Sequence, residues 1–195
     1  TKTPILSTTP SGTYCCQKMF MNCAELTTNR VTFTGTSVNQ YSCDQMYCGC
    51  VKLTTAPNLP ATTITNTYAY RQMFDGCAAL TTGPASLPAK TLKNYCYQYM
   101  FRGCSSLVTA PTISATALGQ YCCQGMFQNC TSLVNTQETL SAATLANFCY
   151  NAMYSGCTSL ITTPSLPATK CVSTCYKEMF KRCISIVIPP ALPAT

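Results

Sequence analysis

The sequence predicts an α/β solenoid of about seven repeats, with short parallel strands on its inner face and short helices on its outer face. A methionine followed by an aromatic residue recurs every 26 or 27 residues along the 195-residue chain. A cysteine lies three residues after each aromatic, and an aliphatic residue lies three beyond that. The pairs are Met19-Phe20, Met46-Tyr47, Met73-Phe74, Met100-Phe101, Met126-Phe127, Met153-Tyr154 and Met179-Phe180. We therefore expect each unit to bury its apolar face against neighbouring copies.

The same register predicts one repeat domain over residues 1–195. Its units start near Tyr14, Tyr41, Tyr68, Tyr95, Tyr121, Phe148 and Thr174. Both ends look like parts of a repeat. Pro4-Ile5-Leu6 resembles Pro57-Asn58-Leu59, and Leu192-Pro193-Ala194-Thr195 matches Leu59-Pro60-Ala61-Thr62. Because a terminal repeat needs a polar cap, we expect an internal piece of a longer array.

A helix of about ten residues is predicted at the start of each unit, because its apolar residues are spaced mostly by three and four. In the fourth unit these residues are Leu92, Tyr95, Cys96, Met100, Cys104 and Leu107. Thr91 precedes them and can cap the first turn.

The end of each helix is predicted by the residue before the repeating cysteine. That position holds Asn22, Gly49, Gly76, Gly103, Asn129, Gly156 and Arg182. Glycine and asparagine enter the left-handed conformation at low cost, as a helix-ending residue must. Arg182 is the exception, so the last helix is expected to end differently.

A short strand is expected after each turn, as in Leu107-Val108-Thr109-Ala110-Pro111. The β-branched residues favour a strand, and the proline ends it because it cannot donate to a ladder. Stacked strands lie about 4.8 Å apart and packed helices about 10 Å apart, so we expect the stack to curve with the strands inside.

The repeat resembles a known family. Met-Phe-x-Gly-Cys-Ser-Ser-Leu at residues 100–107 is similar to the Ala-Phe-x-Gly-Cys-Ser-Ser-Leu signature of the BspA-like leucine-rich repeats. The resemblance covers essentially the whole chain. It implies a leucine-rich-repeat solenoid and a surface protein of a microbe or its phage, acting in adhesion and protein–protein contact. The 26–27-residue period, the methionine in place of alanine, and the added Tyr-Cys pair depart from that family.

The composition disfavours nucleic acid and membrane partners. Charged residues make up 9% of the chain, and the net charge of +7 is spread without a basic run. A nucleic-acid interface needs a basic stripe, ideally with stacking aromatics. No apolar run reaches the ~20 residues that span a bilayer. A surface rich in Thr, Ser, Asn and Gln suits an extracellular, cell-surface or virion setting.

Twelve of the seventeen cysteines are predicted to form two internal columns of thiols. One column holds Cys23 and its equivalents. The other holds Cys15, Ser42, Ala69, Cys96, Cys122, Cys149 and Cys175. Serine and alanine fit a small packing site, whereas a disulfide framework loses cysteines in pairs. A disulfide stays an open alternative for the extra cysteines outside the columns, which are Cys16, Cys43, Cys48, Cys123 and Cys171. Cys48-Gly49-Cys50 lacks the spacing of a zinc pair, so no metal or cofactor is expected.

Catalysis is not expected. The chain has no histidine, which excludes the Ser-His and Cys-His nucleophile arrangements. The five acids are Glu25, Asp44, Asp75, Glu138 and Glu178, and they lie in different repeats or at different repeat positions. A paired-carboxylate mechanism is therefore disfavoured.

The candidate binding face is a polar column two residues after the repeating aliphatic. It holds Thr28, Thr55, Thr82, Thr109, Asn135 and Thr162. We expect this column to face solvent, and the preceding column, from Thr27 to Ile161, to point partly inward. Threonine also suits any solvated strand, so the column can be plain surface.

The leading functional hypothesis is a non-catalytic interaction module that binds a protein or glycan on another surface. The alternative is a structural spacer, or a fibre or virion subunit, that assembles end to end with copies of itself. A flat threonine array binding ice or a crystalline polysaccharide is a weaker third reading, because Val108, Val134 and Ile161 interrupt one column.

Overall fold

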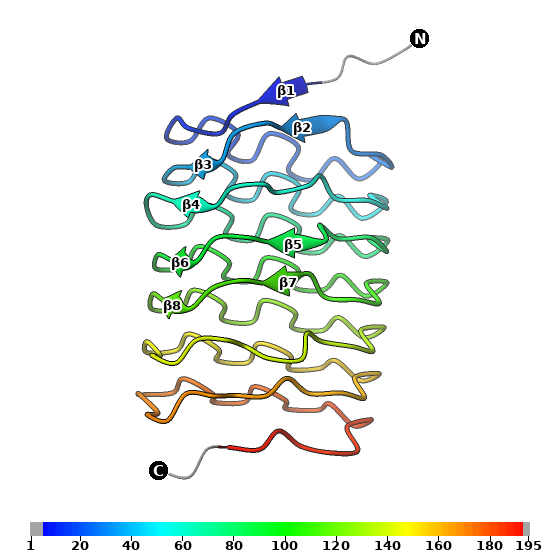
Figure 1. Cartoon of the computed structure of the whole chain (residues 1–195). Helices are drawn as coiled ribbons and strands as arrows, with labels where there is room; N and C mark the ends of the chain where they lie inside the picture. Colours follow the sequence, from blue (N-terminus) through cyan, green and yellow to red (C-terminus); the bar gives the residue numbers. More distant parts are fainter. Residues whose placement is uncertain (1–5, 193–195) are drawn as a thin grey trace.

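The computed structural model describes residues 6–192. The described chain winds into successive coils that lie one above another, in sequence order from the blue end to the red end (Figure 1). The two terminal motifs, Pro4-Ile5-Leu6 and Leu192-Pro193-Ala194-Thr195, lie largely outside these residues.

Eight short strands lie within residues 6–192. They are β1 (Leu6–Thr8), β2 (Val31–Phe33), β3 (Ser37–Val38), β4 (Thr63–Ile64), β5 (Ser86–Leu87), β6 (Thr91–Leu92), β7 (Thr112–Ile113) and β8 (Ala117–Leu118). They pair in parallel as β1-β2, β3-β4, β5-β7 and β6-β8. Each pair joins adjacent coils, and single bridges continue the pattern as far as Thr139↔Ser165. The prediction of short parallel strands is confirmed.

The position of the strands differs from the prediction. β7 begins directly after Pro111, so this proline precedes a strand rather than ending one. The expected strand from Leu107 to Ala110 contributes a single bridge, Thr109↔Asn135. Proline suits a position at the start of a strand, where its missing N–H is not needed.

The predicted helices are wrong, because residues 6–192 contain no helix. Each expected helix is a run of turns in which every fourth residue has a positive φ. In the fourth unit these residues are Tyr95 at 61°, Tyr99 at 53° and Gly103 at 72°. An α-helix needs consecutive right-handed residues, so a left-handed residue every fourth position prevents it. We call this run, from Tyr95 to Cys104 and in equivalent units, the turn segment.

The hydrogen bonds of the turn segment explain its conformation. Alternate N–H groups close turns within the coil, as Met100 donates to the carbonyl of Tyr97 at 3.2 Å. The others donate to the next coil, as Phe101 donates to the carbonyl of Met126 at 2.8 Å. Backbone groups that a helix would satisfy internally are shared here with a neighbouring coil.

The left-handed position before the repeating cysteine is confirmed. Gly76, Gly103 and Gly156 have φ of 75°, 72° and 79°. Arg182 also adopts a positive φ, 62°, so the expected difference at the last turn is not found. The neighbouring coils impose the left-handed conformation even where the side chain disfavours it.

The core lies between the turn segments and the strands. Met73, Met100 and Met126 have no exposed surface, whereas Met19 of the first coil is 47% exposed. The aromatic that follows each methionine stacks on its equivalents, and the rings of Phe74 and Phe101 lie 5.3 Å apart. Each such contact contributes about 0.5–1.5 kcal/mol beyond burial.

The stack was predicted to curve because packed helices are wider than stacked strands. Residues 6–192 contain no helix, so this reason for curvature is absent. Since backbone hydrogen bonds join adjacent coils on both the turn side and the strand side, both sides have similar spacing. Figure 1 accordingly shows evenly spaced coils along a nearly straight axis.

Candidate functional site

The six predicted face residues are all exposed. They are Thr28, Thr55, Thr82, Thr109, Asn135 and Thr162. Parallel bridges join Thr55 to Thr82 and Thr109 to Asn135, so these residues of adjacent coils lie side by side. The column thus presents a row of uncharged hydrogen-bonding groups. That it binds a partner stays a prediction.

The neighbouring column does not point inward as expected. Val108 is 47% exposed and Ile161 is 48% exposed, while Val134 is half-buried. The core at this level is already filled by the adjacent leucines, Leu107, Leu133 and Leu160, which have no exposed surface. Consecutive residues therefore both face solvent, at a corner of the coil.

Two carboxylates of the turn segments are engaged by arginines of the following coil. Asp44 accepts from Arg71 Nε at 2.8 Å and from Gln17 Nε2 at 2.9 Å. Asp44 has no exposed surface. The bond to this carboxylate raises the pKa of Arg71 above its ordinary value. Asp44 is therefore held as a paired ion, and its lone pairs face donors rather than a substrate space.

Asp75 repeats this arrangement one coil further on. It accepts from Arg102 Nε at 2.9 Å and from Gln72 Nε2 at 3.1 Å. The bond to Asp75 raises the pKa of Arg102. Arg102 also lies over the ring of Tyr99, 4.6 Å from its centroid. Each of the two acids pairs with a guanidinium and not with the other acid. The charges therefore join adjacent coils.

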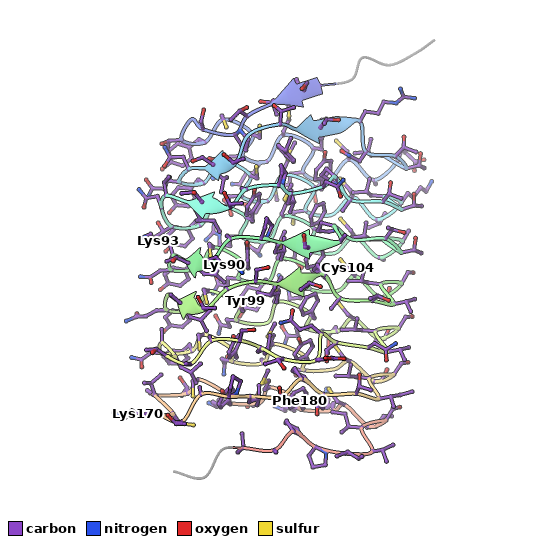
Figure 2. All side chains as sticks on the ribbon, viewed as in Figure 1. Lys90, Lys93, Tyr99, Cys104, Lys170 and Phe180 are labelled. Carbon is purple, nitrogen blue, oxygen red and sulfur yellow. The ribbon has the colours of Figure 1, made fainter. Side chains whose placement is uncertain are left out.

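Three lysines lie away from these ion pairs. Figure 2 shows Lys90, Lys93 and Lys170 along one edge of the stack, and all three are exposed. Two of them belong to the same coil and none stacks with an aromatic ring in the described residues. They form a solvated edge, not a basic stripe.

The prediction of internal thiol columns is confirmed for the middle coils, whereas the first-coil members Cys15 and Cys23 are exposed; all seventeen cysteines are free. Each buried thiol of the first column donates to the carbonyl of an aromatic residue one coil back. Cys104 Sγ lies 3.1 Å from the Phe74 oxygen, and Cys130 Sγ lies 3.0 Å from the Phe101 oxygen. That same oxygen also accepts a turn hydrogen bond, as Phe101 O does from Cys104 N. Each cysteine is thus a small apolar side chain whose S–H group donates to the second lone pair of a backbone carbonyl oxygen.

Burial keeps most of these thiols protonated. It raises the pKa of Cys104 and Cys130 well above the ordinary value. Cys16 in the first coil differs, because a hydrogen bond from Cys43 lowers its pKa to about 6. Cys16 is nevertheless only 5% exposed, so its sulfur has little access to solvent.

A second aromatic ladder lies at the surface of the stack. Its members are Tyr14, Tyr41, Tyr68, Tyr95, Tyr121 and Phe148, with adjacent centroids 4.5–5.0 Å apart. Each of these residues has a positive φ. The stacked rings cover one another's faces, so only their edges meet solvent. Among the rings of the described residues, such a ladder leaves a ring face without a stacked neighbour at its two ends, Tyr14 and Phe148, and Tyr14 is 55% exposed.

Within residues 6–192, no group of three or more His, Cys, Asp or Glu side chains is placed to hold a metal ion. The same residues contain no helix long and apolar enough to cross a membrane.

No family model matches the sequence, and no curated protein matches it. Among solved structures, a leucine-rich repeat protein of T. pallidum matches with 21% identity and a TM-score of 0.47. The match covers 81% of this chain and 62% of that protein, which is less than two thirds of its length.

Sequence reasoning missed the two ion pairs between adjacent coils, Asp44 with Arg71 and Asp75 with Arg102. A signal was available, because Arg71 follows Asp44 by 27 residues and Arg102 follows Asp75 by 27 residues. Residues one period apart occupy the same place in adjacent coils. Opposite charges in one column therefore indicate an ion pair between coils.

Proposed function

We propose that this chain is a non-catalytic leucine-rich-repeat interaction module that binds a protein or glycan at a cell surface. The observation that supports it most directly is the exposed column from Thr28 to Thr162, whose members lie on successive coils. A rigid row of hydroxyl and amide groups, repeated at the coil spacing, suits a partner with regularly spaced polar groups. Residues 100–107, which resemble the BspA-like signature, support the family assignment and an extracellular or virion-surface setting.

The rigidity of the column favours binding. Its backbone is fixed by hydrogen bonds to adjacent coils, as Ala56 N donates to Thr82 O at 2.9 Å. A partner therefore meets side chains that are already in place, and little conformational freedom is lost on association.

The test is binding of the purified chain to arrays of glycans and extracellular-matrix proteins. We expect at least one specific ligand, and we expect Thr82→Lys with Thr109→Lys to reduce its binding strongly by placing two bulky cations in the row. Thr144→Lys is the matched control, because Thr144 is exposed on a different part of the coil. Ligand binding that is equal in the double variant and in the control would exclude this face.

A structural role through end-to-end assembly is the second candidate. Tyr150 N donates to Cys175 O at 3.0 Å and Tyr154 N to Met179 O at 2.9 Å. These backbone hydrogen bonds run along the stack from one coil to the next. We propose that the coils of separate copies join end to end through hydrogen bonds of the same kind. Sedimentation of the 195-residue chain tests this candidate. End-to-end assembly would give oligomers that lengthen with concentration, whereas a chain that stays monomeric or stops at a dimer contradicts it.

A further inference from the structure

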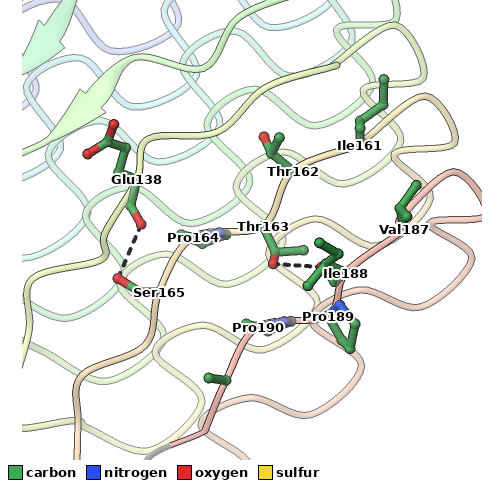
Figure 3. A pocket seen from close by; sticks show the side chains of 11 residues that line it. Glu138, Ile161, Thr162, Thr163, Pro164, Ser165, Val187, Ile188, Pro189 and Pro190 are labelled. Carbon is green, nitrogen blue, oxygen red and sulfur yellow. Dashed lines mark hydrogen bonds between the residues drawn. The ribbon is translucent and has the colours of Figure 1, made fainter.

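An aliphatic stripe, exposed except at the half-buried Val134, runs along the corner of the later coils. Its members are Val108, Val134, Ile161 and Val187, with Ile188 beside the last. Val134 N donates to Val108 O and Ile161 N donates to Val134 O, both at 3.1 Å, so the three lie on adjacent coils in one row. Figure 3 shows Ile161 and Val187 on neighbouring coils, with both side chains pointing away from the ribbon.

The stripe is not required by the fold. In the first three coils the same column holds Thr27, Thr54 and Thr81. The hydroxyl of Thr54 donates to Thr27 O at 3.1 Å, and that of Thr81 donates to Thr54 O at 3.2 Å. Threonine thus satisfies both the backbone conformation and its own hydroxyl at this position. The change to valine and isoleucine places apolar surface in water without a local structural reason.

The stripe borders a shallow hollow that is mostly apolar. Pro164, Pro189 and Pro190 line it together with Ile161, Val187 and Ile188. Its charged group is Glu138, and Thr163 Oγ1 donates to Ile188 O across it at 3.3 Å (Figure 3). Exposed Val187 and Ile188, at 78% and 74%, form its most accessible part.

We propose that the aliphatic stripe is the interface with the same stripe of a second copy of this chain, packed side by side. The spacing favours this occupant. Equivalent residues of adjacent coils repeat at about the distance between stacked rings, 4.7 Å for Tyr68 and Tyr95. A second stack has the same repeat, so its side chains interdigitate along the whole row. Same-face side chains of an extended peptide repeat at about 6.8 Å and lose register after one or two residues.

The charge distribution also fits a second copy. The residues that flank the stripe on adjacent coils, Thr109, Asn135 and Thr162, are uncharged. Lys90, Lys93 and Lys170 lie along another edge (Figure 2). Two copies can therefore approach along the stripe without bringing their excess cations together, and each removes apolar surface from water.

The experiment compares the wild-type chain with V108T/V134T/I161T by sedimentation velocity over a range of concentrations under reducing conditions. We expect a monomer–dimer equilibrium in the wild type and a dissociation constant about a hundredfold higher in the variant. The substitutions copy the threonines of the first coils, so the fold should persist, and an unchanged melting temperature verifies that. T62S/T116S/T144S is the matched control, because it removes three exposed methyl groups away from the stripe and should leave the equilibrium unchanged.

Two results would overturn the proposal. One is a wild-type chain that stays monomeric at every concentration. The other is a dimer of equal strength in the triple variant, which would place self-association elsewhere, such as at the ends of the stack. Should the triple variant unfold, the single Ile161→Lys change at a half-exposed side chain tests the same interface, with the same expected loss of the dimer. Loss of ligand binding in the Thr82 and Thr109 variants neither supports nor contradicts the dimer. Because Thr109 flanks the stripe, the dimer is judged only from the wild type and the stripe variants.

Discussion

Ala152 offers a direct test of the turn segment, because it lies in the middle of a run that sequence periodicity assigns to a helix. Its φ is 52°, and the equivalent residue one coil back is Gly125, with φ 55°. The side chain is half-buried. We predict that Ala152→Gly stabilises the protein, whereas the same change inside a helix would destabilise it by about 1 kcal/mol.

The expected magnitude follows from three contributions. Relief of a left-handed alanine is worth about 1–2 kcal/mol. The greater freedom of glycine in the unfolded chain costs about 0.4–1 kcal/mol. Loss of a half-buried methyl group costs a few tenths, roughly 0.3 kcal/mol. The net result is a gain of about 0.5 kcal/mol, or a rise of roughly 1–2 °C in melting temperature.

The assay is urea unfolding followed by circular dichroism, with an unchanged m-value required for comparison. Ala143→Gly is the control, since Ala143 is exposed and has no positive φ, and it should lose about 0.5–1 kcal/mol. Gly125→Ala should be strongly unfavourable, because its Cβ would clash with the Tyr99 ring. The reasoning is refuted if Ala152→Gly destabilises the protein as much as the control does.

Three further predictions concern charges and thiols. Arg71→Met leaves Asp44 buried without its main partner and should lower the free energy of unfolding in urea by about 3 kcal/mol. The control Lys52→Met removes an exposed pair with Glu25 and should change that free energy by less than about 0.5 kcal/mol. Equal effects would contradict the buried pairing. Burial raises the pKa of Cys96, Cys104 and Cys130 above the ordinary value, so their contribution is fully present below about pH 8.5 and is lost as pH rises beyond it, at about 1.4 kcal/mol per pH unit for each such thiol. Unfolding measured from pH 7 to pH 10 in reductant should show this decline, and a flat profile would mean that the thiols are accessible. Cys15, Cys23 and Cys171 are exposed, so a thiol reagent should modify these three rapidly in the native protein and all seventeen in denaturant; fewer in denaturant without reductant would indicate disulfides.

The core columns could be predicted from the sequence because they depend on period alone. Residues one period apart occupy the same place in adjacent coils, so Met73 and Met100 are both buried whatever the local backbone does. The left-handed glycines were predictable for a similar reason, since Gly103 has no side chain to oppose a positive φ. The sequence placed the candidate face at Thr82 and Thr109 on the surface because this column is polar in six successive units.

What the sequence alone determined is therefore which residues are equivalent, which columns are buried, and where the chain must turn. It did not determine the local conformation. Apolar residues spaced by three and four fit a helix, but the buried pairs Cys96-Tyr97 and Met100-Phe101 repeat every four residues, which fits four-residue turns equally well. Only the tertiary structure decides between them. The N–H groups of Tyr97 and Phe101 find carbonyl acceptors in the next coil, and the stacked rings of Tyr68, Tyr95 and Tyr121 offset the strain of left-handed residues. An isolated unit has neither contribution, because both come from the adjacent coil.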